Sequence, residues 1–184
     1  QGLFNEIIEE RTRHVTVVLE DIFQPQNASA VLRSCDVFGI QDVHVIENDN
    51  EYTLNPKVVL GASKWITLNK YNEQENNTLA CINQLKSNGY KVYATTPHTN
   101  DELIEEMPLD HKCALMFGTE LTGLSETAMT HADGFVKIPM YGFTESLNIS
   151  VSAAICLYEL SKRLKDSDIQ WQLTNEERQD LLLD

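Results

Sequence analysis

Three short segments of the sequence contain polar side chains that could hold and orient an oxygen-containing substrate. The segments are NASAVLR (27–33), FGTELTGLS (117–125) and GFTESLN (142–148). The residues of interest in them are Asn27, Arg33, Glu120, Ser146 and Asn148. A guanidinium binds a phosphate or a developing oxyanion through charge-assisted hydrogen bonds, and a carboxylate accepts from a hydroxyl or an amine. Each of these side chains could therefore contact a ligand, but the set does not define one reaction.

Simpler structural roles are open for each of these residues. Asn27 follows Pro25 after an apolar run, so we expect it to be a helix N-cap. Arg33 is spaced to pair with Asp36 on one helix face, and Ser125 is placed to cap a short helix. A helix that starts at Ser146 would put Asn148 just inside an apolar segment, where a buried amide needs hydrogen-bond partners. Its expected core stripe is Leu147, Val151, Ile155 and Tyr158.

Other catalytic signatures are absent from the sequence. It has no GxGxxG, no GK[ST] after a glycine-rich loop, no GxSxG and no HExxH. The four cysteines are far apart in apolar segments, and the five histidines are scattered, so we predict no metal site. Residue types and spacing alone therefore predict an acidic α/β enzyme of undefined chemistry.

Alternating strands and helices must position the three segments. The predicted strands are 14–21, 42–47, 65–71, 90–96, 112–118 and 134–140, and the predicted helices are 28–39, 73–88, 125–132, 146–165 and 174–184. Strands that are continuous apolar runs favour an α/β fold with a mostly parallel sheet and helices on both faces. Ligands bind beyond the carboxyl ends of such strands, and each segment follows a strand.

The length of 184 residues fits one principal domain. We expect an N-terminal arm at 1–14, a catalytic domain at 15–165, and a linker with a final helix at 166–184, where Thr174 and Glu177 form a capping box. There is no apolar core of a signal peptide at the start and no apolar run of the ~20 residues that a membrane span needs. Buried free thiols favour the cytoplasm.

The net charge of the chain disfavours binding of nucleic acid, except at a local basic patch. Lys and Arg total 14 against 28 Asp and Glu, which gives −14. An acidic chain repels polyanions through its mean field, so RNA binding would require a local basic patch.

Taken in order, the segments resemble the signature of the SpoU (TrmH) family of RNA ribose 2′-O-methyltransferases, in the SPOUT superfamily. NASAVLR matches a first motif N-x-x-x-x-x-R, FGTELTGLS matches the second, and IPMYGFTESLNISVSAA (138–154) matches the third. The ordered trio is highly specific, and the resemblance covers roughly residues 15–165.

This resemblance implies a C-terminal deep trefoil knot, a homodimer and S-adenosylmethionine as the cofactor. It implies that the cofactor is held by Thr95, Gly118, Ile138, Met140 and Leu147. It also implies that Arg33 assists loss of the ribose proton, while Asn27, Glu120, Ser146 and Asn148 orient Arg33 and the ribose. Because a guanidinium normally stays protonated, we expect Arg33 to hold a phosphate and stabilise the developing alkoxide, with the phosphate helping to take the proton.

The substrate that the resemblance implies is RNA. The most similar sub-group methylates a D-loop guanosine of tRNA, and the C-terminal segment LTNEERQDLLLD resembles its last helix. Ribosomal RNA, a non-catalytic cofactor-binding module and a small-molecule O-methyltransferase are the alternatives. For RNA, the basic patch expected on the N-terminal arm is Arg11, Arg13 and His14, although Glu6, Glu9 and Glu10 lie in the same arm.

Overall fold

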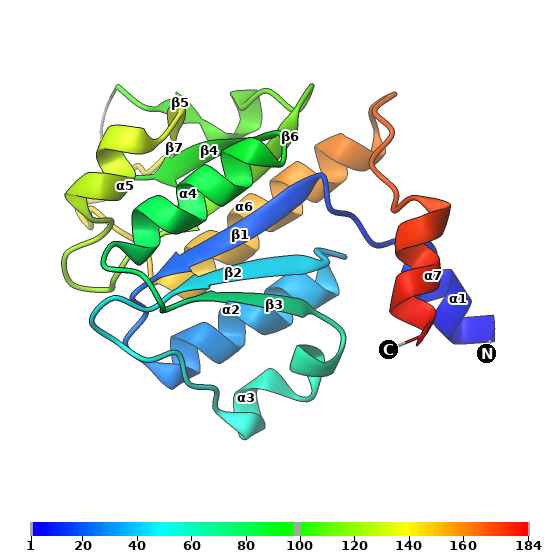
Figure 1. Cartoon of the computed structure of the whole chain (residues 1–184). Helices are drawn as coiled ribbons and strands as arrows, with labels where there is room; N and C mark the ends of the chain where they lie inside the picture. Colours follow the sequence, from blue (N-terminus) through cyan, green and yellow to red (C-terminus); the bar gives the residue numbers. More distant parts are fainter. Residues whose placement is uncertain (1, 98–99, 184) are drawn as a thin grey trace.

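The computed structural model describes residues 2–97 and 100–183, so the outermost residues of the predicted arm and of the last helix, Gln1 and Asp184, lie outside it. Within this part of the chain, seven strands form one sheet in the order β3-β2-β1-β6-β4-β7-β5, and all pairs are parallel (Figure 1). The strands are β1 (Val15–Glu20), β2 (Asp42–Ile46), β3 (Thr67–Tyr71), β4 (Tyr90–Thr95), β5 (Glu102–Leu103), β6 (Lys112–Phe117) and β7 (Gly134–Lys137).

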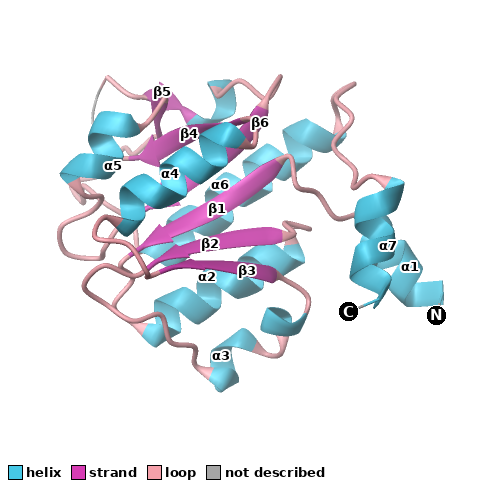
Figure 2. Ribbon diagram, in the orientation of Figure 1, coloured by secondary structure: helices cyan, strands magenta, loops and turns pink. Residues whose placement is uncertain are grey.

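Helices cover both faces of this sheet, as predicted (Figure 2). On one face lie α4 (Asn77–Ser87) and α5 (Glu126–His131), and on the other lie α2 (Pro25–Val37) and α6 (Ile149–Lys165). The remaining helices are α1 (Gly2–Glu9), α3 (Pro56–Val59), α7 (Asn175–Leu183) and the 3-10 turns η1 (Ala62–Lys64) and η2 (Ile104–Glu106). α1 and α7 lie together at one side of the molecule (Figure 1).

The core is divided between the two faces by the alternation of side chains along each strand. In β1, Val17 and Leu19 belong to one apolar cluster with Leu157 of α6, whereas Val18 belongs to another with Ile82 of α4. Every residue of β1 is buried. This is the pattern of a strand covered on both sides, and it confirms the α/β prediction.

The start of α2 differs from the expectation for Asn27. The helix begins at Pro25 with Gln24 as its N-cap, so Asn27 lies in the first turn. Proline fits the first helical position because its missing N–H would have no partner there and its φ is already helical. The side chain of Asn27 is thereby released from capping. Gly39 ends the segment with a φ of 75°, as the prediction of a terminating glycine requires.

The start and the buried face of α6 also differ from expectation. The helix begins at Ile149, and Asn148 is its N-cap rather than an interior residue: its side chain accepts from the N–H of Ser150. The predicted core stripe is wrong, because its members are 39–57% exposed: Leu147, Val151, Ile155 and Tyr158. The face on the sheet is instead Ile149, Ala153, Cys156, Leu157, Leu160 and Leu164. Both stripes are apolar at helical spacing, so spacing alone does not identify which one meets the sheet.

Candidate active site

The carboxyl ends of three neighbouring strands, β6, β4 and β7, surround a cavity of about 670 Å³. Its walls come from the segments that follow these strands and from the first turns of α6. Eight of the predicted site residues line it: Thr95, Gly118, Glu120, Ile138, Met140, Ser146, Leu147 and Asn148. Segments that are far apart in the sequence therefore converge because parallel strands end on the same edge of the sheet.

Asn27 reaches this cavity through hydrogen bonds, although it is not part of its wall. Its Nδ2 donates to Oε1 of Glu120 at 3.0 Å, and its Oδ1 accepts from Nδ2 of Asn148 at 3.3 Å. Asn27 is 6% exposed. It lies after β1 and Glu120 lies after β6, where the strand order reverses, which is the usual ligand position in open α/β sheets. The three motifs thus meet at one buried amide.

The loop that presents Glu120 is closed by its two glycines. A Cβ on Gly118 would lie 2.2 Å from the carbonyl carbon of Gly123, so only glycine allows this backbone approach. Gly123 has a φ of 71°, a left-handed conformation that glycine adopts without strain. Backbone hydrogen bonds of 3.1 and 3.0 Å join Thr119 and Gly123 in both directions. The glycines therefore shape the turn that carries the carboxylate.

Glu20, which the motifs do not indicate, anchors the far end of the same loop. Glu20 ends β1 and is 2% exposed. Its carboxylate accepts from the backbone N–H and the hydroxyl of Ser125, both at 2.7 Å, and from the hydroxyl of Thr78. Ser125 also caps α5 as predicted. The available signal was an acidic residue at the end of a strand that is otherwise wholly apolar or small.

The wall of the cavity combines apolar side chains with a few polar groups. Cys156 of α6 lines it, and burial raises the pKa of this thiol to about 12, so it remains protonated at neutral pH. Thr95 also lines the cavity, and its hydroxyl donates to the carbonyl of Met116 at 2.7 Å. Leu147 and Met140 are about two-fifths exposed at the cavity, at 39% and 37%. Such a wall suits an uncharged ring system better than a phosphate.

Arg33 is placed away from this cavity. It is exposed, and it lines a second cavity of about 400 Å³ between α2, α3 and α6, together with Val37, Val58 and Ala154. The alternative pairing with Asp36 does not occur, because Asp36 binds Arg11 at 2.7 Å. Within one chain, the residue expected to assist the reaction is therefore separated from the residues expected to orient the ribose.

The expected basic patch on the N-terminal arm is not a free cationic surface. Arg11 is 4% exposed, and its guanidinium bonds Asp36, Gln41 and the carbonyls of Ile40 and Trp65. The reason is that residues 10–12 pack beside Gly39, which places the arginine inside the molecule.

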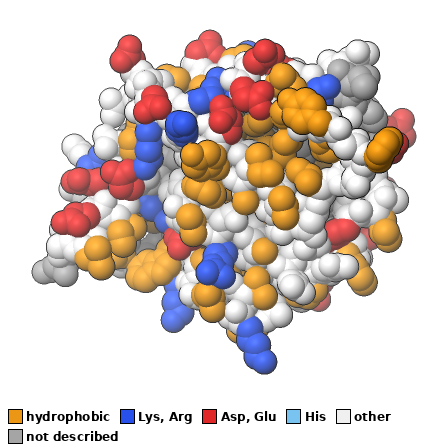
Figure 3. All heavy atoms as spheres, turned by 180° about the vertical axis from the view of Figure 1, so that it is seen from behind, with side chains coloured by type: hydrophobic (Ala, Val, Ile, Leu, Met, Phe, Trp, Pro, Cys, Tyr) orange, Lys and Arg blue, Asp and Glu red, His pale blue; other side chains and the backbone are white. Residues whose placement is uncertain are grey.

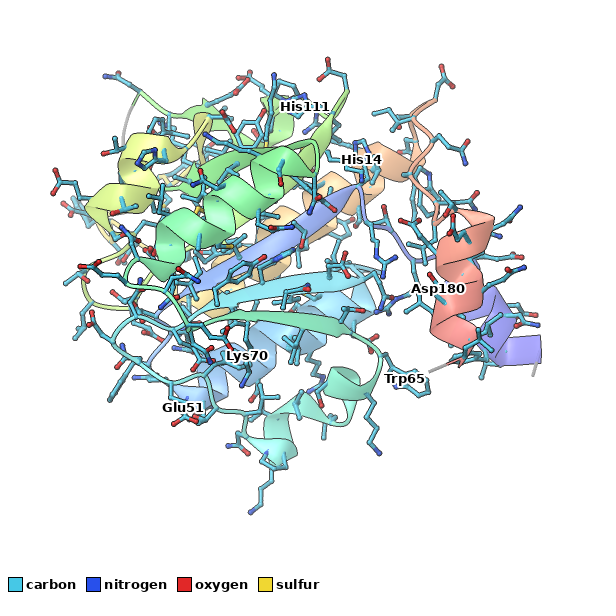
Figure 4. The ribbon with its side chains drawn as sticks, viewed as in Figure 1. His14, Glu51, Trp65, Lys70, His111 and Asp180 are labelled. Atoms are coloured by element: carbon cyan, nitrogen blue, oxygen red, sulfur yellow. The ribbon has the colours of Figure 1, made fainter. Side chains whose placement is uncertain are left out.

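The two other members of that patch have partners as well. Arg13 pairs with Asp42 at 3.0 Å and with Glu177 of α7 at 3.6 Å. His14 binds the carbonyl of Leu109 at 2.7 Å, and Figure 4 shows it at the start of β1, apart from the carboxyl edge of the sheet. Both side chains are thus engaged in holding the arm.

Residues 2–97 and 100–183 contain no group of three or more His, Cys, Asp or Glu side chains arranged to hold a metal ion. The same residues form no helix with the length and hydropathy needed to cross a bilayer.

Comparisons with known proteins agree with the motifs. The model of the SpoU rRNA methylase family matches residues 14–158. The tRNA (guanosine(18)-2′-O)-methyltransferase of Borreliella burgdorferi is 49% identical over 178 residues, which cover 97% of this chain and 80% of that protein. The Thermus thermophilus protein of the same name is 35% identical over 161 residues, 87% of this chain and 81% of that one. Among solved structures, the A. aeolicus TrmH/SpoU tRNA modifying enzyme is similar with a TM-score of 0.86 and 27% identity, over 99% of this chain and 92% of that chain.

Proposed function

This chain belongs to the SpoU rRNA methylase family, and from that premise we propose that it is an S-adenosylmethionine-dependent RNA 2′-O-ribose methyltransferase that acts on a D-loop guanosine of tRNA. The observation that carries the proposal is the meeting of all three motifs at one cavity, through the contacts of Asn27 with Glu120 and Asn148. The names of the relatives favour tRNA over ribosomal RNA.

The cavity fits S-adenosylmethionine in its chemistry. Gly118 allows backbone to approach closely, and Ile138, Met140, Leu147 and Thr95 offer apolar surface and backbone groups for adenine and ribose. When bound, the cofactor supplies an electrophilic methyl group on a sulfonium. A ligand without phosphates needs no glycine-rich phosphate loop, which agrees with the absence of one.

The polar residues hold the acceptor nucleotide. Glu120 is oriented by Asn27 and can accept a hydrogen bond from a ribose hydroxyl, while Ser146 and Asn148 border the same space. Positioning of this kind contributes several kcal/mol to a methyl transfer by removing the entropy cost of alignment. Arg33 binds the adjacent phosphate and stabilises the developing alkoxide, and the phosphate helps to take the proton.

The separation of Arg33 from the cavity supports a homodimer in which a second copy supplies this arginine. α2 and α6 share an exposed apolar face that includes Val37, Val151, Ile155 and Tyr158. Figure 3 shows hydrophobic side chains gathered on this side of the molecule. Burying such a face against its own copy would remove apolar area from water and bring Arg33 to the other copy's cavity.

The order of the strands supports the proposed trefoil knot. β7 lies between β4 and β5, although residues 96–101 join β4 directly to β5. The chain enters β7 from α5 on one face and leaves toward α6 on the other. In the proposed knot, this crossing of the sheet lies inside the connection from β4 to β5. An experimentally determined chain path without this crossing would contradict the proposal.

Methyl transfer from labelled cofactor tests the function. We expect incorporation into a tRNA transcript, and none into the same transcript with a 2′-O-methyl already on the D-loop guanosine. Incorporation into ribosomal RNA alone would assign the ribosomal alternative. Salt-dependent RNA binding without any methyl transfer would indicate a non-catalytic module. Methyl transfer to small hydroxyl compounds alone would indicate a small-molecule enzyme.

The proposed cytoplasmic location agrees with four free buried cysteines and is tested by cell fractionation.

Mixing two inactive variants tests the shared site. Arg33→Ala lacks the arginine, and Glu120→Ala lacks the carboxylate. If Arg33 acts in the other copy's cavity, mixed dimers regain one intact site, and activity returns to about a quarter of the wild-type level. No recovery, or full activity of Arg33→Ala alone with cofactor binding intact, would overturn the assignment. A monomer in sedimentation analysis would do the same.

A further inference from the structure

Residues 52–72 are one of the stretches of this acidic chain that contain no acidic residue. Between Glu51 and Glu73 the sequence contains no Asp or Glu but has the lysines Lys57, Lys64 and Lys70. The chain as a whole carries a net charge of −14. A local cationic surface is what an acidic protein needs in order to bind a polyanion.

The fold exposes two of these lysines on α3 and η1. Lys57 and Lys64 are both exposed, and within residues 2–97 and 100–183 their ammonium groups form no hydrogen bond or ion pair. Lys70 differs, because it lies 3.7 Å from the carboxylate of Glu47. The α3–η1 surface is defined here as Lys57, Leu60, Lys64 and Trp65.

Arg33, which is proposed to act in the other copy's cavity, extends the α3–η1 surface. It shares the 400 Å³ cavity with Val58, the neighbour of Lys57, and α2 packs against both α3 and η1. In Figure 3, several Lys and Arg side chains lie on the lower part of this face, and most of the Asp and Glu side chains lie above them or toward the sides. The residue proposed to hold the phosphate of the target nucleotide is therefore continuous with the two free lysines.

Trp65 adds an aromatic ring beside Lys64. The side chain is 53% exposed, and its ring contacts Phe4 of α1 with centroids 5.5 Å apart. Figure 4 shows Trp65 at the far end of this surface, facing the α1 and α7 helices. An exposed indole beside free cations is the combination that stacks an unpaired base while lysines contact the backbone.

We propose that the α3–η1 surface binds the RNA substrate next to the target nucleotide, with Lys57 and Lys64 on phosphates and Trp65 against a base. This inference rests on the proposed function. The occupant favoured is RNA rather than a second copy of the chain, because lysine is depleted from protein–protein interfaces and two free lysines attract phosphates. The apolar face offered to a second copy is a different set of residues on α2 and α6.

The test compares Lys57→Ala/Lys64→Ala with Lys91→Ala/Lys162→Ala. Lys91 and Lys162 are also exposed and form no ion pair within the described residues. Each double variant therefore removes two positive charges from the protein surface. Binding of a tRNA transcript is measured from low to high salt, together with kcat and KM for methyl transfer and with cofactor affinity. Each lost phosphate contact lowers the slope of log K against log salt by about 0.7–0.9. For Lys57→Ala/Lys64→Ala we expect the salt slope to fall by about 1.5 and KM for tRNA to rise, with kcat and cofactor affinity unchanged. For Lys91→Ala/Lys162→Ala we expect no change in any of these quantities.

Trp65→Ala and Trp65→Phe test the stacking contact. We expect the alanine variant to bind tRNA about tenfold more weakly with an unchanged salt slope, and phenylalanine to restore most of the affinity. Equal behaviour of the two double-lysine variants would overturn the inference. So would a shift in the monomer–dimer equilibrium of Lys57→Ala/Lys64→Ala without a change in salt slope, because the surface would then join two copies. Methyl transfer by the wild-type protein is measured in the same experiment. Absence of transfer by the wild type would contradict the proposed function itself, and would be distinct from a failure of the RNA-binding surface.

Discussion

The side-chain amide of Asn27 donates to the carboxylate of Glu120 at 3.0 Å, across 93 positions of sequence. The contact joins the helix after β1 to the loop after β6, and Asn148 extends it to the start of α6 at 3.3 Å. Since the donor is buried and the acceptor faces the cavity, the pair fixes which way the carboxylate oxygens point.

Replacing Asn27 with Ala should reduce the rate of methyl transfer more than cofactor affinity. The change leaves Glu120 without its amide donor and frees it to rotate, and misplacement of an orienting group by about 1 Å costs on the order of 10²-fold in rate. We therefore expect kcat for tRNA to fall by about that factor. Calorimetric titration of S-adenosylmethionine should give a Kd within about threefold of the wild-type value. A variant with full activity would show that this contact is purely structural.

Gly118→Ala and Gly142→Ala form a matched pair of substitutions, the first at a residue that lines the cavity. The added Cβ at Gly118 would collide with the backbone of Gly123 at 2.2 Å, whereas at Gly142 nothing lies within 4 Å. We expect Gly118→Ala to lose about 1–3 kcal/mol of unfolding free energy and most cofactor binding, because the backbone has to move. Gly142→Ala should resemble the wild type in chemical denaturation and cofactor titration. Similar losses in both variants would contradict this account of the loop.

Glu20→Gln should loosen the loop that carries Glu120. An amide in place of the carboxylate turns one acceptor into a donor, which then faces the N–H or the hydroxyl of Ser125. Hydrogen bonds to a buried charged group contribute about 1.5–3 kcal/mol, so we expect a loss of that order in urea denaturation. The control is Glu126→Gln, an exposed carboxylate one residue beyond Ser125. Equal stability of the two variants would contradict the anchoring role.

His44 should make the protein less stable in mild acid. Burial lowers the pKa of this imidazole to about 4, from an ordinary value of 6.5. Above pH 6.5 both the folded and the unfolded states carry the neutral ring, and the group does not affect stability. Between pH 6.5 and 4 the unfolded chain takes up a proton that the folded chain refuses, so the unfolding free energy falls by up to about 3 kcal/mol.

His44→Gln isolates this contribution. Glutamine retains a polar partner for the Tyr71 hydroxyl, which lies 3.1 Å from Nδ1 of His44. Its unfolding free energy should fall less steeply than that of the wild type from pH 6.5 to 4. Parallel pH profiles in urea denaturation would show that His44 is protonated in the folded state.

The sheet was predictable from sequence because apolar strands and glycine stops are local signals. β1 and β6 occur within the predicted ranges, and the turns at Gly39 and Gly89 occur with positive φ as expected of helix-ending glycines. Strand order was not predictable, since nothing local indicates that β7 inserts between β4 and β5. The choice of buried face on α6 was missed for a related reason: it depends on the sheet, not on the helix.

The site was predictable in its residues but not in its connections. Eight predicted residues line one cavity because their motifs follow strands of a parallel sheet. The role of Asn27 depends on where α2 begins. The helix starts about one turn earlier than predicted, so the side chain of Asn27 does not cap the helix and instead donates a hydrogen bond to Glu120. Arg11 was misassigned because a sequence does not reveal that an arginine will be buried against Asp36.

Cys156 and Ile149 of α6 belong both to the core under the sheet and to the wall of the cavity. During translation these residues leave the ribosome after β1 to β7, so a nascent chain that stops before α6 lacks the helix that covers its sheet beside α2 and that completes the wall of the pocket. Protection of the sheet from aggregation and ability to take up a ligand therefore arise in the same late step. A chaperone or a protease encountering the unfinished chain would meet the apolar surface that the finished enzyme uses to enclose its cofactor.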